Sequence, residues 1–224
     1  QANSSKFMSS GGVGITYNDG ENFLGVSLDK LEAVYQNPGA EGEENMTSLN
    51  PTRNTVSFNS SLALNYMVFE KFNLEGSVSE YNHAERTGDG NNHNITFFND
   101  LYELKTSLNH KSLFNQNVEG LIGFHFQNKN QGATGSEEGH LTPTKTNSFA
   151  FFVLEKLKFD LFDLDLGGRV ESVNLKTTTF DRGFFPVAFS STVKREIIPN
   201  NNVFLGFDFT PVSYTHLRAH ETSL

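Results

Sequence analysis

The chain has 224 residues, of which 36% are hydrophobic, and its mean hydropathy is −0.42. No run of about 18 apolar residues is present, which excludes a transmembrane helix, and a formal net charge of −9 argues against nucleic acid as a partner. Because cysteine is absent, disulfides, thiolate nucleophiles and cysteine-based metal sites are also excluded.

The amino-terminal part of the chain predicts three strands. Val13–Tyr17 and Phe23–Leu31 alternate apolar and polar residues, and they are joined at Asn18–Gly20 by Asn-Asp-Gly, which is typical of a tight hairpin turn. After a polar loop at Tyr35–Ser48, the segment Thr55–Tyr66 shows the clearest alternation in the sequence. Successive side chains of a strand point to opposite faces, so this segment predicts one apolar and one polar face.

The two predicted faces of that third strand differ in the solvent they suit. One face carries the apolar residues Val56, Phe58, Leu62, Leu64 and Tyr66. The other carries the polar residues Thr55, Ser57, Asn59, Ser61 and Asn65. A long strand of this kind suits a wall between hydrocarbon and water, in which apolar residues contact lipid and polar residues line a lumen.

The middle of the chain repeats this pattern. Further alternating strands are predicted over Phe72–Tyr81, Phe98–His110 and Val118–Phe126. They are separated in turn by short connections and by longer polar loops, at Val68–Lys71, Arg86–Asn92, Ser112–Asn117 and Asn128–Thr142.

The carboxy-terminal part adds four predicted strands. Asn147–Phe159 is apolar on both faces, so we expect its inward face to be covered, whereas Phe162–Val170 alternates cleanly. After a loop at Thr177–Gly183, two more strands are predicted at Phe185–Val193 and Val203–Phe209, around a short turn at Pro199–Asn202. Ser213–Leu224 breaks the pattern and resembles a translated sequencing-adapter tail, so we expect residues 213–224 to be an artefact.

The connections alternate between short and long, which is independent of the face polarity. Transmembrane barrels have short periplasmic turns and longer extracellular loops. Together the two patterns predict an all-β fold, an antiparallel up-and-down transmembrane β-barrel. A soluble β-sandwich could show alternating faces, but it would not need long strands joined by strictly alternating short and long links.

Several segments, in matching order, resemble the TonB-dependent outer-membrane receptors, in particular the branch linked to zinc uptake. Ser27–Gly39 (SLDKLEAVYQNPG) is similar to a family strand that runs into a loop with a Tyr…Pro-Gly element. Other matching motifs lie at Pro51–Arg53, at Tyr81–Glu85 with its Tyr-x-His-x-Glu pattern, at Phe98–Glu103, at Gly135–Lys156 and at Gly167–Arg169. These motifs span roughly residues 11–209.

The resemblance implies a fold, a location and partners. A family barrel has about twenty-two strands, so residues 1–212 would supply about ten of them as a partial barrel. It implies a bacterial outer-membrane location, contact with lipid, and a TonB complex reached through a plug domain that this segment lacks. The sequence also departs from the zinc branch, because Ala40–Asn45 (AEGEEN) replaces the His-rich run that often follows Pro-Gly.

Two predicted external loops carry residues that a metal ion could use. His83, Glu85 and His93 flank one loop, and Glu137, Glu138 and His140 lie in another. Imidazole nitrogen and carboxylate oxygen are the zinc ligands left when cysteine is absent. The alternative is that these are ordinary polar loop residues. We expect no bound cofactor, and zinc would be a transported metal.

Charged residues of both signs are expected on the lumen face. They are Glu75, Glu103, Lys105, Glu119, Asp165, Arg169 and Glu171. This mixture predicts cross-strand ion pairs and contacts to a plug, with ion selectivity as the alternative. His125 is expected to face the lumen, and His110 is expected to do so or to lie near a turn, both in structural roles.

The sequence therefore predicts a receptor for active uptake of a scarce nutrient, a metal ion or metal chelate, across the outer membrane. No nucleophile–histidine–acid order and no phosphate-binding motif is present, so an enzyme is not expected. Two alternatives stay open, a passive porin-like channel and a secreted β-sandwich binding module.

Overall fold

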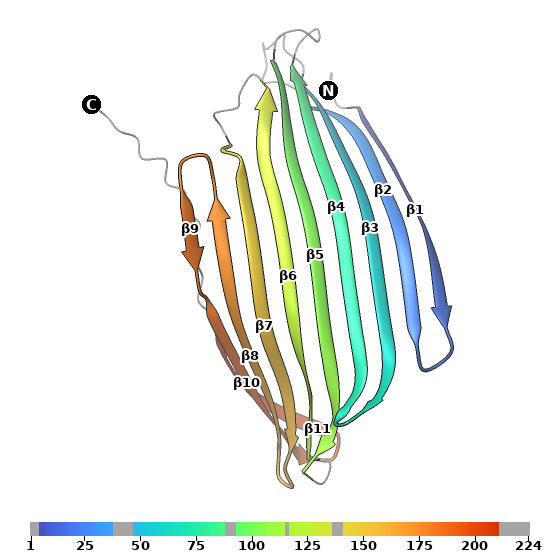
Figure 1. Cartoon of the computed structure of the whole chain (residues 1–224), viewed down its shortest axis with the longest axis vertical. Coiled ribbons are helices and arrows are strands. Elements are labelled where there is room, and N and C mark those ends of the chain that lie inside the picture. Colours follow the sequence, from blue (N-terminus) through green and yellow to red (C-terminus); the bar gives the residue numbers. More distant parts are fainter. Residues whose placement is uncertain (1–4, 38–46, 88–92, 115–116, 136–140, 211–224) are drawn as a thin grey trace, which may run out of the picture.

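A computed structural model describes residues 5–37, 47–87, 93–114, 117–135 and 141–210. These residues form one antiparallel sheet of 11 strands (Figure 1). Among them no helix is long and apolar enough to cross a membrane. No second sheet packs on the first within the described ranges, so this part of the chain is not the β-sandwich that was one alternative.

The strands follow one another along the chain, and those in the middle are the longest. Their bounds are β1 (Lys6–Asn18), β2 (Phe23–Asn37), β3 (Thr47–Tyr66), β4 (Phe69–Thr87), β5 (His93–Leu113), β6 (Val118–Gly135), β7 (Thr144–Lys158), β8 (Asp163–Lys176), β9 (Asp181–Phe184), β10 (Val187–Ile198) and β11 (Asn201–Phe209).

Each strand pairs with its neighbour in sequence, in the order β1 to β8, then β10 and β11. The four-residue strand β9 pairs only with the end of β8. All the short turns lie at one end of the sheet, and the long connections lie at the other (Figure 1). The predicted up-and-down topology is therefore confirmed, with 11 strands in place of about ten.

The short turns owe their shape to a few residues with positive φ. Gly20 has a φ of 94°, which glycine adopts without a steric penalty, in the turn between β1 and β2. In the same turn the Asp19 carboxylate accepts hydrogen bonds from the backbone N–H groups of Asn22 and Glu21. These hydrogen bonds, that from Asn22 first, lower the pKa of Asp19 to about 2.

Backbone register sorts the side chains onto two faces. Val56 on β3 lies opposite Val78 on β4, which in turn lies opposite Tyr102 on β5. One residue further along, Ser57 lies opposite Ser77, and both point to the other face. The predicted separation of an apolar from a polar face is thus a property of the whole sheet, because the pairing keeps like residues in register.

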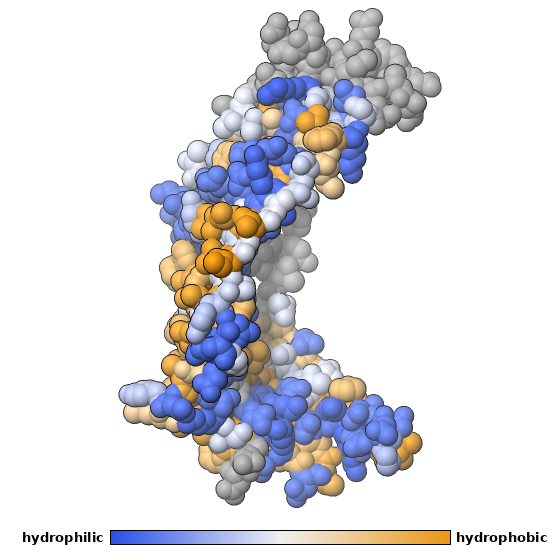
Figure 2. Space-filling view, turned by 90° about the vertical axis from the view of Figure 1, so that its right-hand side faces the viewer, coloured by the Kyte–Doolittle hydropathy of each residue, from blue (hydrophilic) through white to orange (hydrophobic). Residues whose placement is uncertain are grey.

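The apolar face is the outer, convex one, and no described residue covers it. Figure 2 looks onto the β1 edge and shows hydrophobic residues gathered along the convex side of the curved sheet, with hydrophilic residues at both ends. Large side chains on this face are exposed, for example Phe124 at 63% and Phe149 at 62%. An exposed apolar surface of this extent is typical of contact with a membrane or another protein.

The apolar band on the outer face ends at a defined level. On β2 to β5 the band ends, on the side of the long connections, at one register row of polar outward residues, Lys30, Asn54, Glu80 and Asp100. On β6, β7 and β8 the change to polar residues comes slightly nearer the short turns, at Asn128, Asn147 and Ser172. A band boundary that drifts across the register in this way fits strands that are tilted against a membrane.

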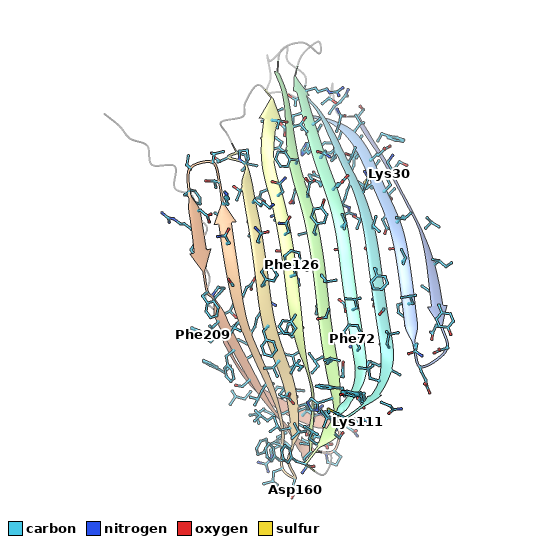
Figure 3. All side chains as sticks on the ribbon, viewed as in Figure 1. Lys30, Phe72, Lys111, Phe126, Asp160 and Phe209 are labelled. Carbon is cyan, nitrogen blue, oxygen red and sulfur yellow. The ribbon has the colours of Figure 1, made fainter. Side chains whose placement is uncertain are left out.

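Several predicted loops are shorter than expected, because the strands extend beyond the apolar band. β6 continues through residues 128–135, so the prediction of a loop across Asn128–Thr142 was wrong for that part. Likewise β9 occupies part of the predicted loop Thr177–Gly183. Figure 3 shows Lys111 and Asp160 at the end with the short turns, and Phe72 and Phe126 further along their strands.

Candidate functional site: the inner face of the sheet

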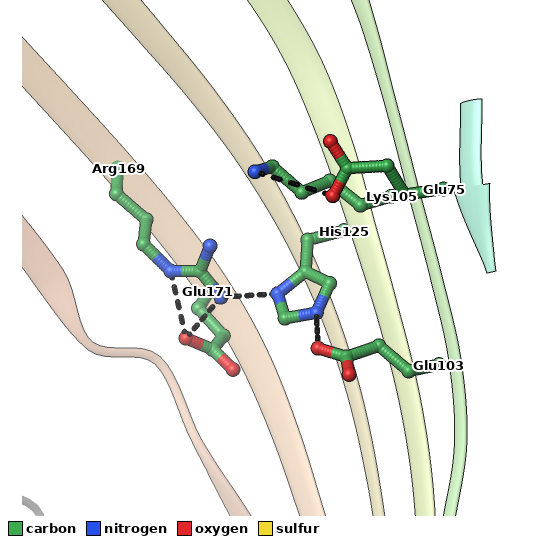
Figure 4. Close-up of polar contacts among 6 residues, drawn as sticks. All are labelled: Glu75, Glu103, Lys105, His125, Arg169 and Glu171. Carbon is green, nitrogen blue, oxygen red and sulfur yellow. Dashed lines mark hydrogen bonds and ion pairs between the residues drawn. The ribbon is translucent and has the colours of Figure 1, made fainter. Parts of the chain in front are cut away.

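A network of charged side chains crosses the middle of the inner, concave face (Figure 4). Oε1 of Glu103 on β5 lies 2.6 Å from Nε2 of His125 on β6. Nδ1 of His125 lies 3.3 Å from a terminal nitrogen of Arg169 on β8, and that guanidinium also binds Glu171 at 3.0 Å. Beside this chain, Lys105 lies 3.9 Å from Glu75.

The hydrogen-bond partners of His125 indicate which of its ring nitrogens donates and which accepts. An arginine side chain only donates hydrogen bonds, so Nδ1 of His125 accepts from Arg169. Nε2 therefore carries the ring proton and donates it to the Glu103 carboxylate. Besides His125, this cluster of Glu75, Glu103, Lys105, Arg169 and Glu171 holds three carboxylates and two cationic side chains.

The prediction of cross-strand ion pairs on the lumen face is confirmed for three of its seven members, Glu75, Lys105 and Glu119. Glu75 pairs with Lys105 between neighbouring strands, whereas Glu103 forms a cross-strand hydrogen bond with His125. Glu119 pairs with Lys158 at 2.6 Å near the short turns. Arg169 and Glu171 differ from these, because they are two residues apart on β8 and pair along a single strand.

An apolar ridge lies beside this network on the same face. Phe152 and Leu154 of β7 point inward, and the Phe152 ring lies over Gly123 of β6, where a Cβ atom would meet the ring and the Thr106 carbonyl oxygen. A hollow of about 340 Å³ lies against the ridge and is lined also by Lys105, His125 and Arg169. The inward side of this strand is therefore apolar, as predicted, only in its middle, at Ala150, Phe152 and Leu154, whereas Lys156 and Lys158 follow on the same side. Nothing among the described residues covers Leu154, which is 49% exposed.

A second cluster surrounds His83 at the end of the inner face that carries the long loops. The rings of Tyr35 on β2, Tyr81 on β4 and Phe97 on β5 have their centroids 6.4, 6.4 and 6.1 Å from that of His83. Nε2 of His83 lies 3.8 Å from Oε1 of Glu85. This nitrogen is buried and has no hydrogen-bond partner, and the same holds for Oδ1 of Asn99 on β5.

The structure tests only part of the predicted metal-ligand set. It brings His83 and Glu85 together on one face of β4. Glu137, Glu138 and His140 lie outside the described residues, and so does the side chain of His93, whose backbone begins β5. Within the described ranges, no three His, Asp or Glu side chains are grouped closely enough to hold one metal ion.

One polar pair lies on the outer face and was not predicted from the sequence. His110 on β5 is 8% exposed. The register places it opposite Gly120 of β6, which in turn lies opposite Glu155 of β7, and all three residues face outward. Nδ1 of His110 donates to the Lys111 carbonyl oxygen at 2.8 Å, and its Nε2 lies 3.1 Å from a Glu155 carboxylate oxygen. His110 thus lies near a turn, which is one of the two expected placements, and it faces outward.

Several solved structures share this fold, and three of them are compared with the chain below. No protein-family model and no curated protein sequence matches the chain. The alcaligin outer-membrane receptor FauA from Bordetella pertussis aligns over 91% of this chain with a TM-score of 0.73 and 9% identity. The copper transporter OprC aligns over 92% with a TM-score of 0.69 and 12% identity. The ferric citrate transporter FecA aligns over 93% with a TM-score of 0.68 and 11% identity.

These likenesses establish the fold of the sheet. At 9–12% identity they show the fold alone, an antiparallel up-and-down sheet like part of the β-barrel of these three proteins. The chain spans 35–36% of the length of these neighbours. Among the described residues, β1 and β11 are the two edges of the sheet.

Proposed function

We propose that this chain is the partial barrel of a TonB-dependent receptor that takes up a scarce nutrient, a metal ion or metal chelate, across the bacterial outer membrane. The observation that carries the proposal is the single-layer sheet with an apolar outer and a charged inner face, in the fold of FauA, OprC and FecA. Lipid on one side and an aqueous lumen on the other explain both faces.

The two free edges of the sheet support a larger barrel. Unpaired backbone N–H and C=O groups are costly in hydrocarbon, where no water can satisfy them. β1 and β11 would each leave such a row of groups in lipid. Further strands of the complete receptor would pair with them and close the barrel.

The inner face favours a receptor over a passive channel. Phe152 and Leu154 offer an apolar surface that a water-filled pore would leave wet, whereas a folded plug would cover it. The ion pairs around Arg169 offer polar contacts to the same plug. A metal substrate is supported by the names of the neighbours, which transport copper and ferric citrate or bind alcaligin, and by the His83–Glu85 pair.

Transport by the complete receptor tests this function directly. Cells that carry the full-length gene should outgrow a deletion strain in medium depleted of transition metals, and only when the TonB motor is intact. Uptake that persists without the motor would instead establish a passive channel. If both strains grow equally on each metal ion or chelate, supplied in turn as the limiting source, the proposal of metal uptake is overturned.

A further inference from the structure

We propose that Lys145 on β7 and Lys176 on β8 bind the phosphate group of a lipid headgroup in the external leaflet of the outer membrane. The inference goes beyond nutrient uptake, although it rests on the membrane placement of the sheet proposed above. The two lysines lie directly opposite each other on the outer face, just beyond the apolar band on the side of the long connections.

The two ammonium groups form a repulsive pair. Residues directly opposite each other on antiparallel strands have Cβ atoms about 4.5–5.5 Å apart, and like charges in this position are destabilising. Both lysines are exposed, and within the described ranges neither forms an ion pair. An anion between them would replace the repulsion by two charge-assisted hydrogen bonds.

The neighbouring strands do not supply that anion. On β6 the residue opposite Lys145 is the neutral Asn130. On β9 Asp181 lies opposite Lys176, but Oδ1 of Asp181 accepts a hydrogen bond from Nδ2 of Asn174 at 2.7 Å. The counter-charge for the two lysines therefore has to come from a bound partner.

The position of the lysines relative to the apolar band matches the level of lipid headgroups. The band ends at Asn147 on β7 and at Ser172 on β8, so Lys145 lies two residues and Lys176 four residues beyond it. At a rise of about 3.4 Å per residue, these steps are about 7 and 14 Å along strands that are tilted in the membrane. A lysine side chain can extend back along its stem toward the band, and the headgroups occupy the layer directly outside the hydrocarbon.

The apolar surface next to the lysines favours a lipid over a free anion. Phe149 and Phe151 on β7 and Val170 on β8 face outward on the same two strands and are 62%, 38% and 37% exposed. The Phe149 ring packs on that of Phe126 with a centroid distance of 4.8 Å. A lipid whose phosphate lies between the lysines can place its acyl chains on this surface, whereas a free phosphate ion uses the charges alone.

An acidic pair limits the site on the side of β5. Glu80 on β4 and Asp100 on β5 lie opposite each other in the same register row of the outer face as Lys145, and they would repel a phosphate. β6 separates Asp100 from Lys145, a spacing of about 10 Å for two strand intervals. This spacing exceeds the Debye length of about 8 Å at physiological ionic strength, so the acidic pair does not cancel the attraction to the lysines.

Binding of dioctanoyl phosphatidic acid to the purified full-length receptor in a neutral detergent tests the site. The double substitution Lys145→Met and Lys176→Met should weaken the affinity, measured by calorimetry, at least tenfold. Lys145→Arg with Lys176→Arg keeps both charges and should stay within twofold of the wild type. The matched control is Lys30→Met, because Lys30 lies in the same register row of the outer face but has its Nζ 2.5 Å from Oε1 of Glu32, and it should change the affinity less than twofold.

Two further ligands decide between a lipid site and its alternatives. If inorganic phosphate binds as tightly as phosphatidic acid, the lysines hold a free anion and the lipid assignment is wrong. If dioctanoyl phosphatidylcholine, which has no net charge, binds as tightly, or if the double methionine variant binds like the wild type, the lysines do not recognise the phosphate. Metal uptake separates this inference from the proposed function, because a receptor that binds phosphatidic acid through these lysines but transports no metal overturns only the latter.

Discussion

The outer and inner faces of this sheet are built from the same strands but obey different rules. On the outer face, apolar residues predominate over β3 to β8, with exceptions such as Ser60 and the His110–Glu155 pair, and no described residue covers this face. On the inner face, small polar residues such as Ser57 and Ser77 lie on β3 and β4, while a charged network runs from Glu75 on β4 to Arg169 on β8. In the proposed receptor the outer face would contact lipid, which is a uniform solvent, whereas the composition of the inner face would vary with what it contacts.

The largest expected effect tests the contrast between the faces. Phe58→Lys should destabilise the folded receptor in lipid by about 2–4 kcal/mol, because it places a charge near the middle of the apolar band. The adjacent residue Asn59 faces the lumen, so Asn59→Lys should cost little. Unfolding of the full-length receptor in urea, reconstituted in lipid vesicles, measures both, and equal losses would contradict the assignment of the two faces.

A second prediction concerns close packing on the inner face. Gly123→Ala should destabilise the barrel by about 1–3 kcal/mol, since the new methyl group would displace the Phe152 ring or press on the Thr106 carbonyl. Gly183→Ala is the control, because a Cβ there meets nothing nearer than a carbonyl oxygen at 3.9 Å. The same urea titration applies. If Gly123→Ala has no effect on stability, the Phe152 ring of β7 does not pack over Gly123 of β6.

The comparison of the faces also explains what the sequence could predict. Alternation in Thr55–Tyr66 placed Val56 and Phe58 outward correctly, because an apolar face imposes a period of two on a strand. Residues 128–135 of β6 extend beyond the apolar band, where polar residues occupy both faces. No period marks such a segment, and a polar stretch without a period is naturally interpreted as a loop.

The candidate sites depended on register, which the sequence does not contain. The motif around Tyr81 and His83 was visible, but Tyr35 comes from β2, two strands away, and meets His83 only once three strands are paired. The His110–Glu155 pair likewise spans two pairings, across Gly120. A glycine that lets a long side chain reach over its strand was the one available signal, and it cannot be recognised without the partner strands.

A third, smaller effect is expected within the charged network. Arg169→Met should cost about 1–2 kcal/mol, because it leaves Glu171, which is only 21% exposed, without its cation and removes the donor to His125. Arg182→Met on β9 is the control, since the contact described for Arg182 is with the Phe180 ring and its loss should stay within about 0.5 kcal/mol. Urea unfolding of the two variants compares them, and similar losses would show that the network adds no stability.

The smallest effect should come from the pair of Glu75 and Lys105. Their charged atoms are 3.9 Å apart and their side chains are about half exposed, at 54% and 48%. Because water and salt screen such a pair, Lys105→Met should change the free energy of unfolding of a barrel that lacks its plug by less than about 0.5 kcal/mol. The difference from wild type, measured by urea unfolding, should shrink further in high salt. A loss above about 1 kcal/mol that salt leaves unchanged would show that the barrel wall itself shields this part of the inner face from water. The contrast between the exposed pair of Glu75 and Lys105 and the less exposed pair of Arg169 and Glu171 would then have to be abandoned.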